Sequence, residues 1–223
     1  MWVCSPKGGC GKSTTCILTG LEAARSGMSV CILDTDPKLW LSQWANAKRL
    51  PDNLAVHQVE QRHLTEAALA AAEHYDYVLI DVEGSDDASL IDAVLVSDLV
   101  IVPTKASRLD ALAAVQVLKQ VRQKSLVLKR DIAAKVLLAQ TEPGAVEFRI
   151  TGEIKSVLQQ ANAPVFATHL ANRPIFQAMI SFGGDYLDLP KRFHGSSPQS
   201  AHANVAALAR EISATLSEIL KAA

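Results

Sequence analysis

The sequence predicts an α/β fold of the doubly wound type, with a mostly parallel sheet flanked by helices. Short apolar runs alternate with longer stretches in which apolar residues recur at helical spacing, and this order is typical of successive strand and helix units. Several runs are apolar at every position, which indicates strands buried on both faces. A glycine-rich turn lies between the first predicted strand and the first predicted helix.

The predicted elements follow one another along the whole chain. Strands are expected at residues 2–5, 29–34, 77–81, 99–103 and 134–139. Helices are expected at residues 12–26, 39–48, 64–74, 88–96, 109–122, 147–161, 174–182 and 201–221. Because no repeat, low-complexity tract or linker interrupts this succession, we expect a single domain over residues 1–223.

Length and composition are those of an ordinary soluble protein. A chain of 223 residues is long enough to bury one substantial core. No apolar run reaches the roughly 18 residues of a membrane helix, and the sequence opens on a strand-like segment without a charged leader. We therefore expect a cytoplasmic protein that is not attached to a membrane.

The charge is distributed unevenly, although the net charge is only -1. Residues 1–100 carry seven Lys and Arg against fourteen Asp and Glu, whereas residues 101–223 carry fifteen against nine. The C-terminal half is therefore basic. Such asymmetry indicates either a surface that faces nucleic acid or an ordinary solvated face, and the sequence leaves both open.

The strongest motif is the glycine-rich turn itself. It reads Ser5-Pro6-Lys7-Gly8-Gly9-Cys10-Gly11-Lys12-Ser13-Thr14. Glycines let backbone N–H groups approach phosphate oxygens closely, and the helix N-terminus adds a positive dipole. Lys12 supplies a charge to the β- and γ-phosphates, and the hydroxyl of Ser13 is suited to bind Mg²⁺. The turn thus predicts a nucleotide-binding loop made of Gly8, Gly9, Cys10, Gly11, Lys12, Ser13 and Thr14.

This loop departs from the general P-loop pattern in two places. Pro6 stands where the general pattern has its first glycine, and Lys7 is an additional lysine. The form K-G-G-x-G-K-[ST] resembles the deviant Walker A motif of the ParA/MinD family, which includes plasmid partition ATPases. The resemblance implies a P-loop NTPase that binds ATP and Mg²⁺. It also implies that Lys7 reaches across an ATP-dependent homodimer to the partner's phosphates, like an arginine finger; the alternative is a solvent-facing lysine.

Two aspartates end the second predicted strand, in the segment Asp34-Thr35-Asp36-Pro37. Ligands of open α/β sheets bind at this edge. The corresponding segment of the family is its first switch, which implies that Asp36 lies near the attacking water and acts in catalysis with Lys7 and Lys12. For Asp34 the resemblance implies outer-shell support of Mg²⁺. The alternative for Asp34 is that it caps the helix that follows.

The third predicted strand is apolar and ends in Asp81, which is the form of a Walker B strand. Its carboxylate is expected to hold a Mg²⁺-bound water, so that Ser13, Asp34 and Asp81 are the predicted metal residues. The family usually continues with a proline-containing second switch, whereas this chain continues with Val82, Glu83 and Gly84. Gly84 can supply the mobile backbone of such a switch, but the acidic side chains change how water is positioned.

The predicted strand at residues 134–139 ends where the family usually offers an asparagine to adenine. Here Gln140 follows, and its amide can both donate and accept. The preference for adenine therefore rests on the resemblance. Earlier, the strand at 99–103 and the loop after it resemble a part of the family that lies near the dimer face.

The helix after the first switch carries Trp40 and Trp44, which are four residues apart and therefore share one helix face. We favour packing in the core over a partner-binding face. In having tryptophans at this place, the segment resembles the small partition ATPases and their conjugation-associated relatives. These small members lack an N-terminal helix-turn-helix, so binding to a specific operator is not expected.

Nonspecific DNA binding by the ATP dimer is implied by the same resemblance. Arg149, Arg173, Lys191 and Arg192 are the candidate contacts, and Arg173 best matches a family position, just ahead of the predicted helix 174–182. The basic half also offers Lys119, Arg122, Lys124, Lys129 and Arg130 as phosphate contacts. Simple solvation of these side chains is the alternative.

Together these features predict a slow, partner-stimulated ATPase that segregates or positions plasmid DNA with a ParB-like adaptor. As implied by the family, it is cytoplasmic and associates with the bacterial nucleoid when ATP is bound. One alternative is a conjugation-associated ATPase that acts with the transfer machinery. Another is a MinD-like membrane-cycling regulator, which the alanine-rich, near-neutral last helix disfavours. A metabolic ATP-dependent enzyme of similar fold is the third.

Overall fold

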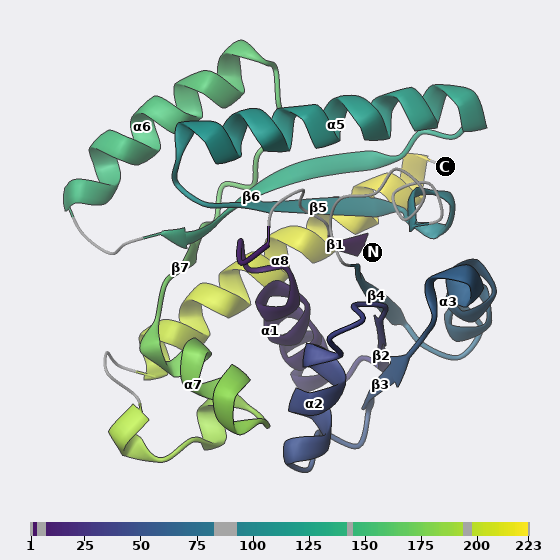
Figure 1. Ribbon diagram of the computed structural model, residues 1–223, viewed down its shortest axis with the longest axis vertical. Coiled ribbons are helices and arrows are strands. Elements are labelled where there is room, and N and C mark those ends of the chain that lie inside the picture. Colours follow the sequence, from purple (N-terminus) through teal and green to yellow (C-terminus); the bar gives the residue numbers. More distant parts are fainter. Residues whose placement is uncertain (1, 4–7, 83–92, 142–144, 194–197, 223) are drawn as a thin grey trace.

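The computed structural model of the chain describes residues 2–3, 8–82, 93–141, 145–193 and 198–222. A seven-stranded sheet runs through it in the order β3-β2-β4-β1-β5-β6-β7 (Figure 1). Every strand pair within these residues is parallel. The strands are β1 (Trp2–Val3), β2 (Val30–Asp34), β3 (Leu54–Gln58), β4 (Tyr77–Asp81), β5 (Leu99–Thr104), β6 (Ala133–Thr141) and β7 (Leu170–Ala171).

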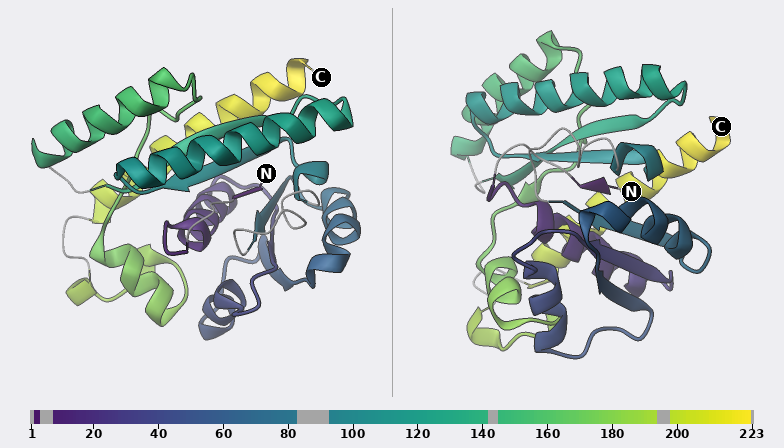
Figure 2. Two further views of the ribbon diagram at one scale, coloured as in Figure 1. Left: turned by 45° about the horizontal axis from the view of Figure 1, so that its top comes forward. Right: turned by 45° about the vertical axis from the view of Figure 1, so that its right-hand side comes forward.

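Helices cover both faces of this sheet, as Figures 1 and 2 show. One face carries α1 (Lys12–Arg25), α2 (Trp40–Ala47), α7 (Pro174–Phe182) and α8 (Pro198–Ala222). The other carries α3 (Leu64–Ala72), α5 (Arg108–Leu128) and α6 (Ala145–Gln160). Short 3₁₀ turns lie at Gln61–His63, Tyr186–Asp188 and Lys191–Phe193. The predicted doubly wound α/β fold is confirmed.

The central strands are buried on both faces, as their continuous apolar sequence predicts. In β2, Ile32 packs in the core under α1 and α8, whereas Cys31 and Leu33 pack in the core under α3 and α5. In β5, Ile101 and Val102 divide between the two cores in the same way. Successive side chains of a strand point to opposite faces, so each strand needs apolar residues at every position.

Helix α5 begins and ends with recognisable caps. The side chain of Ser107 accepts a hydrogen bond from the backbone N–H of Asp110 at 3.1 Å and donates to its carboxylate at 2.6 Å. The helix ends at Leu128, and its C-cap, Lys129, adopts the left-handed conformation with φ of 52°. The predicted end at residue 122 was too early: α5 continues to Leu128, which packs partly against the core, although Leu126 and Val127 before it are exposed.

Two short strands were not predicted. β3 pairs only with β2, at the edge of the sheet, and its last two residues are exposed. β7 has only two residues. Neither has the continuous apolar run that marks the central strands. Of the predicted helix at 88–96, residues 93–96 are helical and the rest lies outside the described residues.

The prediction that Trp40 and Trp44 both pack in the core is wrong for Trp40. Trp44 is 2% exposed, and its indole N–H donates to the carbonyl of Gly184 at 2.9 Å. Trp40 is 53% exposed. It is the first residue of α2, whereas Trp44 lies one turn further along, in the part of the helix that contacts α7.

Gly183 allows α7 to end directly against α2. Its φ is +74°, and an added Cβ atom would lie 2.4 Å from Cβ of Ala47 and 3.0 Å from the carbonyl oxygen of Trp44. Gly27 also has a positive φ, +88°, but an added Cβ would meet nothing within 4 Å. A side chain at Gly27 would therefore meet backbone strain alone, whereas a side chain at Gly183 would meet backbone strain and a steric clash.

We predict that Gly183→Ala lowers the free energy of unfolding more than Gly27→Ala does. Gly27→Ala should cost about 1 kcal/mol, from the left-handed backbone alone. Gly183→Ala should cost about 1–3 kcal/mol more, because the added methyl group overpacks the contact between α2 and α7. Urea unfolding of both variants measures the difference. Equal losses would contradict the close contact at Gly183.

Candidate nucleotide-binding site

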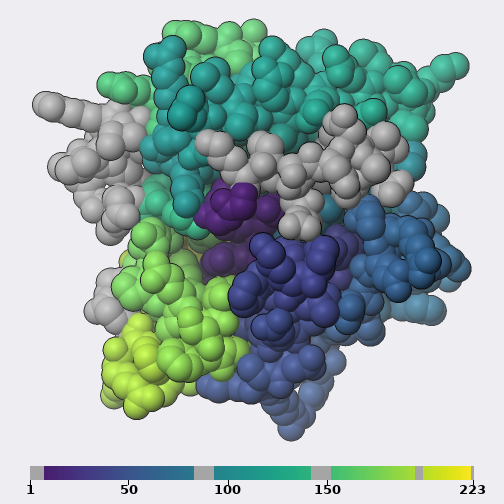
Figure 3. Space-filling view, in the orientation of Figure 1, coloured from purple at the N-terminus to yellow at the C-terminus, as the bar shows by residue number. Residues whose placement is uncertain are grey.

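The predicted phosphate loop lies at the carboxyl edge of the sheet. β1 pairs with β4 on one side and with β5 on the other, so the loop leaves the sheet at its centre. Asp34 and Asp81 end the neighbouring strands β2 and β4 and are direct partners in the strand register. In Figure 3, purple atoms near the start of the chain lie between the green atoms of α7 and the dark blue atoms of α2. Polar groups of three strands thus converge on one place.

The loop has the backbone that close phosphate contact requires. Gly9 and Gly11 have φ of 71° and 100°, values that residues with a side chain rarely adopt. Gly11 is the N-cap of α1, and its carbonyl accepts hydrogen bonds from the N–H and the hydroxyl of Thr15 at 2.8 Å and 2.7 Å. Gly8 and Gly9 are exposed, whereas Cys10 is buried. Lys7 lies outside the described residues.

Ser13 and Asp81 are brought together, as the sequence predicts. The Ser13 hydroxyl donates to a carboxylate oxygen of Asp81 at 2.6 Å. Burial raises the pKa of Asp81 from 3.8 to about 7. The hydrogen bond from Ser13 and the charge of Lys12 lower this pKa, whereas the neighbouring charge of Asp34 raises it further. The carboxyl group therefore lacks a full counter-charge.

These residues fit a magnesium ion. The second carboxylate oxygen of Asp81, Oδ1, is buried and has no hydrogen-bond partner in the described part of the chain. Hydroxyl and carboxylate oxygens are ligands that Mg²⁺ prefers. Within the residues described, no group of three or more His, Cys, Asp or Glu could hold a metal ion. A site with few protein ligands is what Mg²⁺ uses when phosphates and water complete its coordination.

Asp34 serves the helix that follows it. One of its carboxylate oxygens accepts from the N–H and the hydroxyl of Ser42 in α2, at 2.9 Å and 2.8 Å. The other accepts from the N–H of Asp36 at 3.2 Å. Asp34 therefore binds a backbone N–H in the first turn of α2, as the capping alternative expected, although the N-cap residue itself is Leu39. Outer-shell support of Mg²⁺ by Asp34 stays a prediction.

Asp36 lies just beyond β2 at the same edge and is half-buried. Its carboxylate accepts from the N–H of Lys38 at 2.8 Å. Between the two aspartates, Thr35 donates both its N–H and its hydroxyl to the carbonyl of Asp81, each at 3.0 Å. This pair of bonds fixes the end of β2 to the end of β4. The predicted second switch, with Glu83 and Gly84, lies outside the described residues.

A pocket of about 370 Å³ lies beside the loop, and Gly11 and Thr14 form part of its wall. Gln140 lines it, has φ of 54°, and donates from its side-chain amide to the carbonyl of Gly9 at 3.0 Å. Asn172 and Gln177 also line the pocket and are hydrogen-bonded to each other at 3.2 Å. The pocket therefore combines amide groups with an apolar wall next to the phosphate loop.

Sequence reasoning identified Gln140 in this pocket but missed Asn172 and Gln177. Both are far from the loop in sequence, and they reach the pocket beside it only because α7 folds back and packs against α2. A signal was present: the segment with Arg173 was matched to a family position, and Asn172 directly precedes it.

Almost the whole chain matches the model of a known protein family. A model of the family described as VirC1 protein matches residues 1–222. The chain belongs to the VirC1 family. Protein ParA of Rhizobium radiobacter is 30% identical over 220 residues, which cover 98% of each chain. Protein virC1 of Rhizobium rhizogenes is 30% identical over 193 residues, which cover 83% of this chain and 82% of that protein.

The fold of this VirC1-family protein is that of the ParA/MinD-type P-loop NTPases. MinD from Pyrococcus horikoshii, solved with Mg-ADP, superposes with a TM-score of 0.67 at 16% identity. The superposition covers 95% of this chain and 94% of that chain. The P-loop NTPase fold and the ParA/MinD resemblance predicted from the loop are confirmed.

The candidate DNA contacts of the VirC1-family protein lie in different surroundings. Arg173 is half-buried in the wall of the pocket beside the loop and donates to the hydroxyl of Ser200 at 3.0 Å. Lys191 and Arg192 are exposed, and the guanidinium of Arg192 lies 4.7 Å from the ring centre of Phe193. Arg149 is in α6, but its side chain is outside the described residues. Their contacts with DNA stay predictions.

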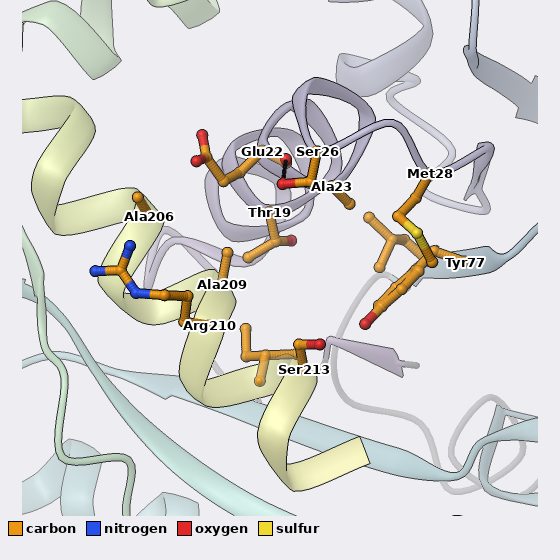
Figure 4. Close-up of a pocket in the computed structure, with 12 residues that line it drawn as sticks. Thr19, Glu22, Ala23, Ser26, Met28, Tyr77, Ala206, Ala209, Arg210 and Ser213 are labelled. Atoms are coloured by element: carbon orange, nitrogen blue, oxygen red, sulfur yellow. Dashed lines mark hydrogen bonds between the residues drawn. The ribbon is translucent and has the colours of Figure 1, made fainter. Parts of the chain in front are cut away.

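A second pocket of about 370 Å³ lies at the opposite edge of the sheet, between α1 and α8. Tyr77, at the start of β4, forms part of its wall, and Figure 4 shows Arg210 pointing away from Tyr77. Glu22, which also lines it, is paired with Arg25 and His202. Among the residues that line this pocket, none belongs to the phosphate loop or to the pocket beside it.

We predict that the stability of the nucleotide-free protein depends on the protonation of Asp81. Because the pKa is raised from 3.8 to about 7, the folded state holds a proton that the unfolded state has lost between these values. This contribution is present below the unfolded pKa and is lost as the pH rises through about 7. At about 1.4 kcal/mol per pKa unit, it amounts to a few kcal/mol.

The matched variant is Asp81→Asn, whose side chain resembles the protonated acid and does not titrate. Without Mg²⁺ and nucleotide, the variant should gain stability relative to the wild type when the pH is raised from about 5 to about 8. Urea unfolding at both pH values measures this gain. A difference between the two proteins that does not change with pH would contradict the raised pKa.

Proposed function

We propose that this VirC1-family protein is an ATPase that dimerises with ATP and Mg²⁺, binds DNA nonspecifically and positions plasmid DNA together with a partner protein. The contact between Ser13 and Asp81, 2.6 Å long at the N-terminus of α1, is the observation that carries the proposal. It joins a phosphate-binding loop to the acid of a Walker B strand, as Mg²⁺-dependent nucleotide binding requires.

The nucleotide would lie along the loop, with its phosphates against the backbone from Gly8 to Thr14 and the ammonium group of Lys12. Its base would enter the neighbouring pocket, where Gln140, Asn172 and Gln177 offer amide donors and acceptors to an adenine edge. In the bound state, Ser13 and Asp81 would hold Mg²⁺, which supplies positive charge to the phosphates.

The second copy would cover the carboxyl edge. Leu109, Leu112 and Trp40 are 71%, 45% and 53% exposed, and each is near the start of a helix that leaves this edge. Exposed apolar side chains around a ligand site support contact with a further protein surface. There Lys7 of one copy would reach the phosphates of the other and stabilise the charge that develops during transfer.

Hydrolysis would depend on Asp36, which lies beyond β2 and faces the same edge. Its role is to orient the attacking water, while Lys12 and Lys7 stabilise charge on the transferred phosphoryl group. Thr35, which directly precedes Asp36, is hydrogen-bonded to the carbonyl of Asp81. Movement of Asp36 would therefore shift Asp81, the residue proposed to hold Mg²⁺. Slow, partner-stimulated turnover follows if the partner is needed to complete this arrangement.

DNA binding would be nonspecific and electrostatic, through Lys191 and Arg192 with Arg149 and Arg173 as further candidates. The relative named ParA supports a role in partition, with a ParB-like adaptor as the partner. A component of the DNA-transfer machinery is the alternative partner. In the described residues no helix is long and apolar enough to cross a membrane.

We predict that two substitutions separate dimerisation from hydrolysis. Asp36→Ala should trap an ATP-bound dimer, because the nucleotide still binds but water is no longer oriented. Lys7→Ala should remain monomeric with ATP or hydrolyse it poorly, because the trans contact is lost. Size-exclusion chromatography with ATP and Mg²⁺, together with phosphate release, measures both effects; Lys48→Ala, an exposed lysine after α2, is the control.

The trapped Asp36→Ala dimer also tests the DNA part of the proposal. It should co-sediment with a DNA duplex of arbitrary sequence only when ATP is present, and anionic vesicles should not retain it. Unchanged oligomerisation and turnover in both variants would refute the switch. ATP-dependent retention on vesicles but never on DNA would replace the proposal with a membrane-cycling role.

A further inference from the structure

A groove of about 750 Å³ lies away from the nucleotide site, on the face of the sheet covered by α5 and α6. Its walls are the C-terminal half of α5, the turn into β6 and the segment at 161–164 that follows α6. Because Ala133 and Ala134 begin β6, the groove lies at the amino edge of the sheet, opposite Ser13 and Asp81. A ligand here would leave the carboxyl edge free.

The floor and one rim of the groove are apolar. Val121 and Ile132 are buried beneath it, and Leu118 packs partly against the same core. On the rim, Leu126 is 73% exposed; Val127, the next residue along α5, is 79% exposed but does not line the groove. Large apolar side chains left open beside a concave apolar floor are typical of a binding surface for protein.

The other parts of the rim are basic. Lys119, Arg122 and Lys129 line the groove and are exposed, and none of them forms an ion pair with any residue that the structure describes. Arg130 is different, because it donates to the carbonyl of Leu95 and to the carboxylate of Asp98, each at 2.7 Å. Asp131 is the acidic residue among those that line the groove. Three unpaired cations therefore surround an apolar floor.

We infer that this groove is the docking site for an acidic amphipathic helix of a partner protein. Apolar side chains spaced by three and four residues along one face of such a helix would fill the floor and cover Leu126. Glu and Asp on its flanks would pair with Lys119, Arg122 and Lys129. This charge complementarity would raise the association rate and fix the orientation of the bound helix.

A DNA duplex matches this surface less well, although these same cations are candidate phosphate contacts. A duplex presents regularly spaced phosphates and no projecting apolar groups, so the floor and Leu126 would remain unfilled. The inference does not depend on ATP or on dimerisation. It assigns the amino edge to a protein partner, while the carboxyl edge serves nucleotide.

A displayed library of acidic amphipathic helices tests the inference on the full-length protein. Its members are about 16 residues long, roughly 24 Å of helix, with Glu or Asp on one face and varied apolar residues on the other. A second library has Lys and Arg in place of the acids. The wild type should enrich members of the acidic library and none of the basic one, and added salt should weaken the binding.

Two variants and one control locate the binding. Lys119→Glu/Lys129→Glu should weaken the selected peptides at least about tenfold, and Leu126→Ser should weaken them several-fold. Lys155→Glu/Lys221→Glu changes the net charge equally at exposed lysines outside the groove and should leave affinity unchanged. Thermal unfolding confirms that each variant is folded.

Three outcomes would overturn the inference. The first is failure to enrich any acidic helix. The second is equal weakening by the groove variant and the control variant, which would indicate a general charge effect. The third is a DNA duplex that competes with the selected peptides and is lost with Lys119→Glu/Lys129→Glu but not with Leu126→Ser, which would make the groove a nucleic-acid surface.

Discussion

The hydroxyl of Ser13 donates to the carboxylate of Asp81 across 2.6 Å, and this bond connects the start of α1 with the end of β4. Its position depends on the sheet order, because β4 must lie between β1 and β2 for a phosphate loop and two acidic strand ends to meet. Thr35 extends the connection to β2 through two bonds to the Asp81 carbonyl. The glycine-rich loop, the end of β2 and the end of β4 are therefore held as one unit, and the proposed ATPase function rests on that unit.

The site is organised around negative charge that the protein alone does not balance. Burial raises the pKa of Asp81 to about 7, and Asp34 adds to the effect although Lys12 opposes it. Asp34 is stabilised by Ser42, but Asp81 keeps a buried oxygen without a hydrogen-bond partner among the described residues. A divalent cation with a bound nucleotide would remove this imbalance, so ligand binding and local stability are coupled. The amino edge has the opposite character: around its apolar groove lie cations that form no ion pair with the described part of the chain, which supports a division of labour between the two edges.

Local sequence predicted most of the fold and the centre of the site. The central strands were found because burial on both faces requires continuous apolar runs such as that at residues 30–33, and the loop was found because its glycines and lysines have fixed spacing. The edge strand β3 and the two-residue β7 lack such runs, and the exposure of Trp40 depends on where α2 begins. Asn172 and Gln177 reach the pocket beside the loop only through tertiary folding, and the pairing of Arg130 with Asp98 also depends on tertiary folding. Sequence spacing carries none of these long-range relationships.

The most direct test of the central claim is the Mg²⁺ dependence of ATP binding, measured by titration calorimetry on the wild type and on Ser13→Ala. The claim predicts that Mg²⁺ tightens ATP binding to the wild type by about tenfold or more, and that Ser13→Ala removes most of this gain while the protein stays folded. Thr19→Ser, in the middle of α1, is the matched control, because its hydroxyl bonds only within the helix. ATP binding that is absent, or that is equally sensitive to Mg²⁺ in wild type and Ser13→Ala, would contradict a Mg²⁺-nucleotide site built on Ser13 and Asp81.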